Sequence, residues 1–564
     1  MGNEDKEDLM RPEDVEGLTV GGLLDLVTER RPEDDALVYV DRGLRCSYAE
    51  FNEAVERCAR ALMALGLEKG DHVAVWGQNV PEWVTLQFAT GKIGTVLVTI
   101  NPAYKATELK YVLEQSDAAA LFLTEGVKGA DFVEILREAA PGLADAEGGE
   151  LELEELPYLK HVVLIGDETG SSPGITTYDE FIEGAEKVSE DELRERQSSL
   201  DADEVINMQY TSGTTGFPKG VQLTHENIVK NAFYIGECME LGPEDRVCIP
   251  VPFFHCFGCV LGTLNTVTHE GTMVPVEQFD AEEVLKAVHE ERCTALLGVP
   301  TMFIAELGHE NYGEYDTSSL RTGIMAGSPC PEEVMKQVVN DMGAEEITIA
   351  YGQTESSPVI TQTRTEDPIK LRVSTVGRKL PDVEIKLVDV GTGEEVGPGE
   401  QGDLCTRGYH VMKGYYKMPD ETAEVIDDEG WLHTGDLAVM DEDGYVKIMG
   451  RADDTIIRGG ENVYPREIEE FLYTLEGVSD VQVYGVPDEK YGEKVAAAVI
   501  KKQDASITEE DVKEYCREGI ARHKVPEYVD FVEEYPMTAS GKIQKYKLRE
   551  AAVERYNLAT AGTA

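Results

Sequence analysis

The chain has 564 residues, of which 51 are Lys or Arg and 109 are Asp or Glu, so its formal net charge is −58. This length exceeds one hydrophobic core and predicts at least two domains, while the 41% share of apolar residues is typical of a globular protein. The acidic surplus runs along the whole chain, which predicts a strongly hydrated surface suited to a salt-rich cytoplasm and argues against a nucleic-acid partner.

The N-terminal segment, residues 1–17, has no apolar core flanked by basic residues, and no run in the chain is long enough to span a bilayer. We therefore expect neither a secretory signal nor a transmembrane segment, and predict a cytoplasmic protein. Ten cysteines are scattered along the chain, and only Cys256 and Cys259 form a C-x-x-C pair. Without a second pair or a His partner motif, we interpret both as packing residues.

From about residue 18 to 125, short β-branched runs alternate with helical patterns. We predict a strand over residues 72–76, a helix over 81–93 and a strand over 95–100. Similar alternation from 206 to about 359 predicts parallel sheets with helices on both faces. An acidic stretch between them, residues 142–155, is interpreted as a solvated surface insertion.

After residue 376 the pattern changes to strands with Gly-rich turns, which predict an antiparallel sheet or a distorted barrel. Beyond residue 451 we predict a helix over 466–475, strands over 478–486 and 494–501, and a helix over 509–521. The fold class expected is thus α/β and α+β. Residues 1–452 form a large N-terminal domain of doubly wound sheets with a distorted β-barrel, and residues 453–564 form a small α+β C-terminal domain.

The sharpest local signal is YTSGTTGFPKG, residues 210–220, which follows a short apolar run. Its three glycines let the backbone approach a polyanion, and Lys219 supplies a cation. The spacing differs from that of the P-loop NTPases, and a flexible linker would need neither the Pro-Lys-Gly ending nor a preceding strand. The segment therefore predicts a phosphate cradle, whose hydroxyl donors are Thr211, Ser212, Thr214 and Thr215.

This segment is the first of seven motifs that, in their order along the chain, resemble those of the adenylate-forming enzymes. That family includes acyl-CoA synthetases, luciferases and peptide-synthetase adenylation domains. The other motifs are PFFH at 252–255, YGQTE at 351–355, TGD at 434–436, GRAD at 450–453, RGGEN at 458–462 and SGK at 540–542. The resemblance spans about residues 18–548 and implies that the chain uses ATP, Mg²⁺ and coenzyme A.

The resemblance also implies roles for single residues in binding Mg-ATP. Tyr351 would stack on adenine, Thr354 would bond the α-phosphate, and Glu355 with Thr211 would hold Mg²⁺. A carboxylate can accept both ribose hydroxyls, which suits Asp436. The complete set implied for nucleotide binding is Thr211, Ser212, Gly213, Thr214, Thr215, Gly216, Lys219, Gly327, Ser328, Tyr351, Asp436 and Arg451.

Further implied roles concern the reaction and the second substrate. Lys542 would bridge the attacking carboxylate and the ribose-phosphate oxygen during adenylation. His255 would act as a gate that meets the substrate carboxylate, and Gly258 and Gly262 would line an acyl tunnel together with residues 298–301. The small domain of the family is mobile and rotates about a hinge, here Asp453, so that Gly459, Gly460 and Glu461 approach pantetheine.

The function implied is AMP-forming ligation of a fatty acid to coenzyme A, and the segments VPTMFIAEL and YPMTASGKIQKYKLRE are most similar to those of medium-chain ligases. Long-chain and aryl-CoA ligases are the near alternatives. A stand-alone loader of an acyl carrier protein is another, and a non-enzymatic nucleotide-binding protein is disfavoured by Lys542. Members of this family often dimerise, so the resemblance is compatible with a homodimer.

Overall fold

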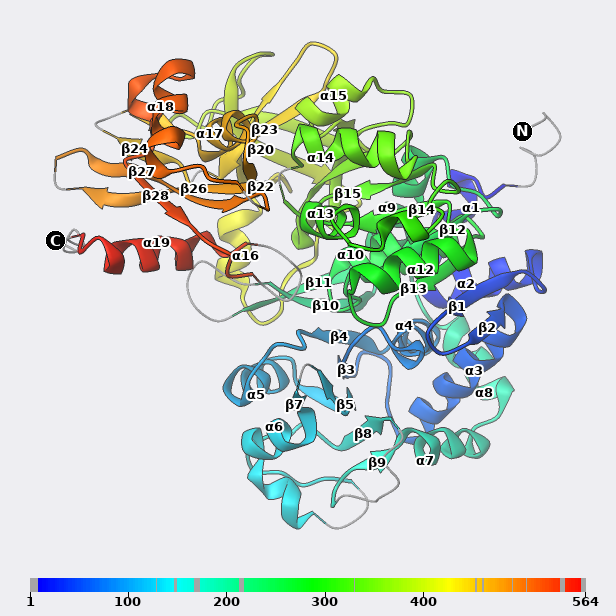
Figure 1. Cartoon of the computed structure of the whole chain (residues 1–564). Coiled ribbons are helices and arrows are strands. Elements are labelled where there is room, and N and C mark those ends of the chain that lie inside the picture. The colour runs from blue at the N-terminus through cyan, green and yellow to red at the C-terminus, as the bar shows by residue number, and fades with distance from the viewer. Residues whose placement is uncertain are drawn as a thin grey trace.

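The computed structural model describes residues 9–127, 129–146, 150–166, 173–211, 218–328, 330–451, 454–458, 461–488, 490–503, 505–537 and 543–558. Two large, mainly parallel sheets form the N-terminal part, and smaller sheets follow along the chain (Figure 1). Among the described residues, no helix combines the length and the apolar composition that a membrane crossing needs.

The eight-stranded sheet has the order β21-β11-β10-β4-β3-β5-β8-β9. Its central strands are buried along their whole length, which is why they are read from the sequence as continuous apolar runs. The strand predicted over 72–76 is confirmed, and the one predicted over 95–100 begins one residue later. The strands are β3 (His72–Trp76), β4 (Val96–Ile100), β5 (Ala118–Thr124), β8 (His161–Ile165), β9 (Thr176–Thr177), β10 (Val205–Thr211), β11 (Lys219–Thr224) and β21 (Gly414–Tyr415).

The nine-stranded sheet has the order β18-β17-β16-β15-β14-β12-β13-β1-β2, with antiparallel strands only toward its two edges. Its core is the parallel run from β16 to β1, as the alternating pattern predicts. The strands are β1 (Asp35–Tyr39), β2 (Leu44–Ser47), β12 (Arg246–Ile249), β13 (Thr272–Pro275), β14 (Ala295–Gly298), β15 (Thr322–Met325), β16 (Thr348–Gly352), β17 (Val359–Gln362) and β18 (Arg378–Lys379).

Helices pack between the two sheets and on their outer faces. The largest apolar core joins residues of both sheets, such as Val75 and Ile249, through α2 (Val20–Arg30), α3 (Tyr48–Ala64), α4 (Pro81–Ile93) and α9 (His225–Met239). Helix α4 matches its predicted bounds and is buried on every side beyond its first two residues, as a helix between two sheets must be. The outer helices are α5 (Ala106–Gln115) and α6 (Phe132–Ala139) on the eight-stranded sheet, and α12 (Ala281–Glu291), α13 (Pro300–Leu307) and α14 (Glu332–Gln337) on the nine-stranded sheet.

The acidic stretch at 142–155 differs from its interpretation as a solvated insertion. Leu143, Leu151 and Leu153 are buried in the outer core of the eight-stranded sheet, while Glu152 and Glu154 are exposed. The interpretation was wrong because it weighed the number of acidic residues and not their alternation with leucine, which turns one side of the segment inward.

The predicted antiparallel sheet is confirmed, with the order β19 (Val383–Val388), β20 (Gln401–Gly408), β22 (Leu432–Met440) and β23 (Val446–Arg451). Each neighbouring pair in it is antiparallel. The short helix α16 (Pro419–Val425) lies between β21 and β22 in the chain. Strand β22 of this sheet carries Asp436, the predicted ribose contact.

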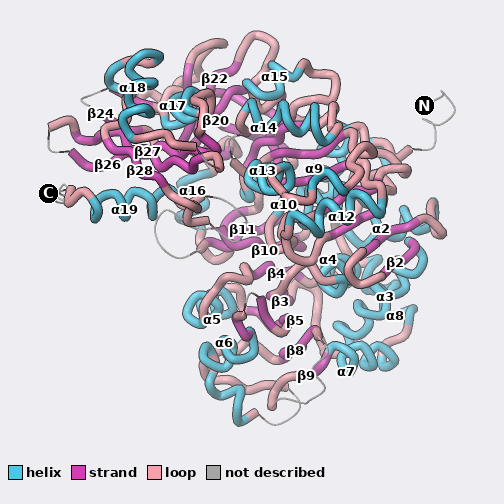
Figure 2. The backbone as a smooth tube through the Cα atoms, in the orientation of Figure 1, coloured by secondary structure: helices cyan, strands magenta, loops and turns pink. Residues whose placement is uncertain are grey.

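The small α+β C-terminal part is also confirmed, with its own apolar cores on the two faces of one sheet. Figure 2 shows α17 and α18 on one side of its strands and α19 on the other. The predicted helix over 466–475 ends three residues early, where the chain turns into the next strand. The elements are β24 (Ile456–Arg458), β25 (Glu461–Val463), α17 (Pro465–Leu472), β26 (Val478–Asp488), β27 (Gly492–Lys501), α18 (Glu509–Gly519), β28 (Tyr528–Phe531) and α19 (Lys545–Arg555). The predicted domain boundary at 452/453 lies outside the described residues.

Candidate active site

The predicted phosphate cradle is the connection of an antiparallel hairpin. Strands β10 and β11 pair up to their ends, where Thr211 lies opposite Lys219. The connecting residues Ser212, Gly213, Thr214, Thr215 and Gly216 lie outside the described part of the chain. The hairpin therefore fixes both ends of the predicted cradle and places its lysine beside its first hydroxyl.

Tyr415 joins this hairpin to the predicted magnesium ligand. Strand β21 pairs with β11, so that Tyr415 lies opposite Val221. The Lys219 ammonium lies 4.8 Å from the centroid of the Tyr415 ring, and the Tyr415 hydroxyl donates to Glu355 Oε1 at 2.8 Å. The sequence reasoning missed Tyr415, because a pairing between segments so far apart leaves no local signal.

The YGQTE segment turns sharply as it leaves strand β16. A Cβ atom on Gly352 would lie 1.8 Å from the carbonyl oxygen of Pro358, so only glycine fits this close approach. A 3₁₀ turn follows at Thr354–Ser356, in which Thr354 is buried and Glu355 half-buried. The Met412 N–H donates to the Glu355 carbonyl at 2.9 Å, which ties this turn to the segment that carries Tyr415.

Tyr351 and Asp436, predicted separately as adenine and ribose contacts, touch each other. The Tyr351 hydroxyl donates to Asp436 Oδ2 at 2.6 Å, and Asp436 is nearly buried. Strand β16 of the nine-stranded sheet and strand β22 of the antiparallel sheet thus meet at this point. One nucleoside could therefore contact both side chains.

A bulge in β22 carries Asp436. Opposite Asp403 and Cys405 of β20, the β22 partners are Leu437 and His433, so β22 has two extra residues here. Gly435 within the bulge has φ +73°, a left-handed conformation that favours glycine. Asp403 Oδ1 accepts the Gly435 N–H at 3.0 Å, and this hydrogen bond from the neighbouring strand β20 stabilises the bulge.

Gly327 and Ser328, which belong to the predicted nucleotide-binding set, follow the carboxyl end of β15, the parallel neighbour of β16. Gly327 is exposed and has φ +86°, so the chain turns away from the sheet immediately after the strand, and Ser328 follows. Tyr351 leaves the same edge of the sheet on β16. Ligands of doubly wound sheets bind beyond the carboxyl ends of the strands, which is where these residues lie.

His255 caps the short helix α10 (Cys256–Gly258). Its Nδ1 accepts the Phe257 N–H at 3.1 Å, which assigns the proton of the neutral ring to Nε2. The side chain is half-buried next to the apolar core. It is therefore held in one orientation with a defined tautomer.

Gly258 and Gly262 are small for a packing reason. A Cβ on Gly258 would lie 2.2 Å from the Pro252 carbonyl oxygen, and one on Gly262 would lie 2.7 Å from Ile249 Cγ2. Their size therefore allows this helical segment to lie close to Ile249 of β12 and to the Pro252 carbonyl, and their place in the wall of an acyl tunnel stays a prediction.

Cys256 and Cys259 are buried and contact the same side chain. The Cys256 thiol donates to Gln209 Oε1 at 2.9 Å, and Gln209 Nε2 donates to Cys259 Sγ at 3.0 Å. Burial raises the pKa of the Cys259 thiol to about 12. This pair behaves as packing residues and links the His255 helix to β10, two residues before Thr211.

Comparison with known proteins identifies the family. The chain matches the AMP-binding enzyme family over residues 24–416 and the AMP-binding enzyme C-terminal domain over residues 467–542. The chain belongs to the AMP-binding enzyme family. It is 56% identical over 543 residues to YngI of Bacillus subtilis, named as an acyl-CoA synthetase, a match that covers 96% of this chain and 98% of YngI.

More distant relatives agree with this assignment. The medium-chain acyl-CoA ligase ACSF2 of Danio rerio is 41% identical, over 96% of this chain and 90% of its own length. Among solved structures, the anthranilate CoA ligase AuaEII has a TM-score of 0.82 at 26% identity, covering 97% of this chain and 100% of that one. The fatty acyl CoA synthetase of Mycobacterium tuberculosis has a TM-score of 0.69 at 29% identity, covering 95% and 99%. This AMP-binding enzyme thus belongs with the acyl-CoA synthetases, which are AMP-forming acid–thiol ligases.

Several predicted residues of this AMP-binding enzyme lie outside the described residues. They are Lys542, the hinge residue Asp453, and the glycines Gly459 and Gly460. For two more the backbone alone is described, since Arg451 ends β23 opposite Asp436 and Glu461 begins β25.

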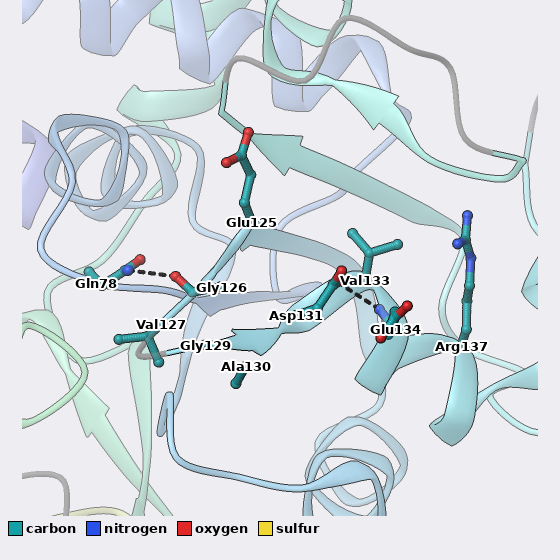
Figure 3. Close-up of a pocket in the computed structure, with 10 residues that line it drawn as sticks. All are labelled: Gln78, Glu125, Gly126, Val127, Gly129, Ala130, Asp131, Val133, Glu134 and Arg137. Carbon is teal, nitrogen blue, oxygen red and sulfur yellow. Dashed lines mark hydrogen bonds between the residues drawn. The ribbon is translucent and has the colours of Figure 1, made fainter.

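A cavity of about 540 Å³ lies at the ends of β3 and β5 (Figure 3). Gln78 Nε2 donates to the Gly126 carbonyl in its lining at 2.6 Å. Its lining includes three carboxylates, Glu125, Asp131 and Glu134, against one guanidinium. This charge is unfavourable for a polyphosphate, so the cavity does not compete with the hairpin as the nucleotide site.

Proposed function

We propose that this AMP-binding enzyme joins a medium-chain fatty acid to coenzyme A through an acyl-adenylate. The carboxylate attacks the α-phosphorus of Mg-ATP and releases pyrophosphate, and the thiol of coenzyme A then attacks the acyl carbon and releases AMP. The observation that carries this proposal is the connected set of side chains Lys219, Tyr415 and Glu355, which joins the phosphate hairpin to the YGQTE turn.

In this proposal the nucleotide lies across the carboxyl edge of the nine-stranded sheet. Tyr351 stacks on adenine, and Gly327 and Ser328 line its other side. Asp436 and Arg451 contact the ribose, and Thr354 bonds the α-phosphate. The residues that hold the remaining phosphates are Thr211, Ser212, Gly213, Thr214, Thr215, Gly216 and Lys219.

The residues present suit a magnesium ion carried by ATP. Glu355 supplies hard carboxylate oxygen, and Tyr415 orients that carboxylate through Oε1, as outer partners of metal ligands commonly do. Thr211 ends strand β10 and offers a hydroxyl. When bound, the ion would supply positive charge to the phosphates, and Tyr415 would hold its ligand Glu355 in place.

The chemical steps need residues of both parts of the chain. Lys542 provides positive charge to the attacking carboxylate and the α-phosphate during adenylation, and His255 meets the carboxylate at the acyl entrance. The C-terminal part, residues 453–564, then rotates about Asp453 against residues 1–452, which removes Lys542 and brings Gly459, Gly460 and Glu461 toward pantetheine.

The substrate class follows from the named relatives. The 41% identical relative of Danio rerio is a medium-chain acyl-CoA ligase, which supports an unbranched medium-chain acid. We also place the enzyme in a salt-rich cytoplasm, as its charge of −58 suggests.

A panel of acids tests the substrate assignment. Straight-chain acids from acetate to palmitate, with benzoate and 4-coumarate, are assayed for AMP release in the presence and absence of coenzyme A. Each buried methylene contributes about 0.8 kcal/mol, so kcat/KM should rise about fourfold per methylene until the site is filled. We expect the maximum among medium-chain acids.

The other outcomes of the panel separate the alternatives. Preference for an aromatic acid or for acetate would exclude the fatty-acid assignment and leave the ligase chemistry intact. AMP release that never depends on coenzyme A would favour a stand-alone loader of an acyl carrier protein.

A further inference from the structure

Three side chains of different chemistry converge behind the β22 bulge. His433 Nδ1 lies 3.0 Å from Asp403 Oδ2 and 3.3 Å from Cys405 Sγ, and Cys405 Sγ lies 3.7 Å from Asp403 Oδ2. Cys405 and His433 are direct partners on neighbouring antiparallel strands, so the backbone pairing itself holds them together. An imidazole, a thiol and a carboxylate thus face one point from two strands.

These separations match those between the ligands of a tetrahedral zinc ion. Zinc–nitrogen and zinc–oxygen bonds of about 2.0–2.1 Å and a zinc–sulfur bond of about 2.3 Å give ligand–ligand distances of about 3.3–3.6 Å. Each of the three observed gaps lies within a few tenths of an ångström of that range. An ion could therefore enter with small side-chain rotations and no change of the strands.

Asp403 and His433 each have a further partner that fixes the orientation of the side chain. Asp403 Oδ1 accepts the Gly435 N–H at 3.0 Å, which leaves Oδ2 directed at the imidazole. On the other side of the ring, His433 Nε2 lies 3.7 Å from Asp427 Oδ2. Asp427 is itself held by the backbone N–H groups of Glu429 and Trp431, both at 2.9 Å. A carboxylate on the non-ligating nitrogen of a histidine is a common feature of metal sites.

The charge and the ligand types around this point suit a metal ion. Asp403 and Asp427 flank one imidazole ring, so the negative charge of two carboxylates favours a bound cation. Cys405 adds a sulfur ligand, and a thiolate is a strong ligand for zinc and a weak one for magnesium. The His433 side chain is 37% exposed, which leaves a way in for the ion and for a water as fourth ligand.

We propose that Asp403, Cys405 and His433 form a binding site for a borderline divalent cation of the zinc type. Binding replaces the proton of the Cys405 thiol, which passes to solvent, and the neutral imidazole and the carboxylate bind through their lone pairs. The site is distinct from that of Mg-ATP, and it shares Asp403 with the bulge that carries Asp436.

Cobalt(II) provides the test, because a thiolate bound to cobalt gives a near-ultraviolet charge-transfer band. The full-length protein, treated with a chelator and free of ATP, is titrated with Co²⁺ and then with Zn²⁺. We expect a charge-transfer band with tetrahedral visible bands at one equivalent, displacement by Zn²⁺, and no displacement by excess Mg²⁺. Calorimetry in two buffers of different ionisation enthalpy should report release of a proton on Zn²⁺ binding.

Variants separate this site from binding elsewhere. Cys405→Ser should abolish the charge-transfer band, and His433→Gln should weaken Zn²⁺ affinity at least about tenfold. Cys46→Ser, which changes a half-buried thiol on β2, is the matched control and should retain both. Thermal unfolding establishes that each variant is folded, and Cys405→Ala replaces the serine variant if needed. Absence of the band in the parent protein, or its retention in Cys405→Ser, would overturn the proposal.

Discussion

Contacts between single residues decide which motif positions act together. Tyr351 and Asp436 could each be chosen from the sequence because each belongs to a recognisable motif, but their hydrogen bond joins two sheets and is visible only in the fold. Tyr415 belongs to no recognisable motif. It contacts Lys219 and Glu355 because β21 pairs with β11, and side-chain patterns do not encode such a pairing.

The Tyr415 hydroxyl can be removed while its ring stays in place. In Tyr415→Phe the ring remains beside Lys219, but Glu355 loses the hydrogen bond that orients it. Hydrogen bonds to charged groups contribute about 1.5–3 kcal/mol, so the Mg²⁺ concentration that supports half-maximal ATP–pyrophosphate exchange should rise at least about tenfold. Calorimetric binding of Mg-ATP without turnover should weaken in parallel.

The matched control is Tyr416→Phe. The Tyr416 hydroxyl donates to Asp117, the residue before β5, at 3.0 Å. This variant should keep the Mg²⁺ requirement of the parent enzyme. Equal requirements in the two variants would contradict a role for Tyr415 in holding Glu355.

Lys542 should act in the first half-reaction alone. In Lys542→Ala, acyl-AMP formation should fall by at least about a hundredfold, because a positioned charge is lost from the transition state. Thioester formation from supplied acyl-AMP should be largely spared. Pyrophosphate release and acyl-CoA yield are measured separately, and Lys547→Ala serves as the control because Lys547 matches no motif. Equal loss of both half-reactions would refute the assignment.

At the scale of elements, agreement with the sequence depends on how a segment is buried. Strand β3 has the predicted bounds because its full burial gives a nearly continuous apolar run, and helix α4 has them because Pro81 begins it and the left-handed Gly94 ends it. The segment at 142–155 was misinterpreted because only one of its sides faces the core. The ends of elements were predicted less accurately. Helix α17 ends before its predicted end because turn contacts that lead into the next strand set the position.

Helix α13 carries a buried ionisable side chain, Glu306. Glu306 is 1% exposed, and its Oε2 has no hydrogen-bond partner among the described residues. Burial raises the pKa of this carboxyl to about 8. Because the folded state binds the proton more tightly than the unfolded state, the stability due to this group falls as pH rises from about 4.5 to about 8.

Glu306→Gln removes this titration while keeping the shape of the side chain. The variant should be more stable than the parent at pH 7 by about 3 kcal/mol, since each pKa unit corresponds to about 1.4 kcal/mol, and the difference should vanish near pH 4.5. Denaturant unfolding at pH 5, 6, 7 and 8 measures it. Glu310→Gln, which changes an exposed carboxylate shortly after α13 in the chain, should leave the pH dependence of stability unchanged. A parallel slope in parent and Glu306→Gln would contradict the assignment.

For the whole molecule, the charge of −58 sets the dependence on salt. Screening lengths fall from about 10 Å at 0.1 M to about 3 Å at 1 M salt, so repulsion among surface carboxylates is largely removed at high salt. The unfolding temperature and the coenzyme A-dependent activity should both rise between 0.1 M and 2 M KCl. Sucrose at equal osmolality is the control and should not replace KCl in supporting activity. Full stability and activity in dilute buffer would contradict a salt-adapted surface.

The pairing of β21 with β11 also bears on how the protein is made. Strand β11 emerges from the ribosome nearly two hundred residues before the segment that completes its edge. At about 5–20 residues per second, roughly 10–40 s of synthesis separate the two. During that interval the hairpin of the phosphate cradle presents an unpaired edge, which is open to pairing with other chains. The eight-stranded sheet therefore closes late in translation, and the step that closes it is the one that brings Tyr415 to Glu355.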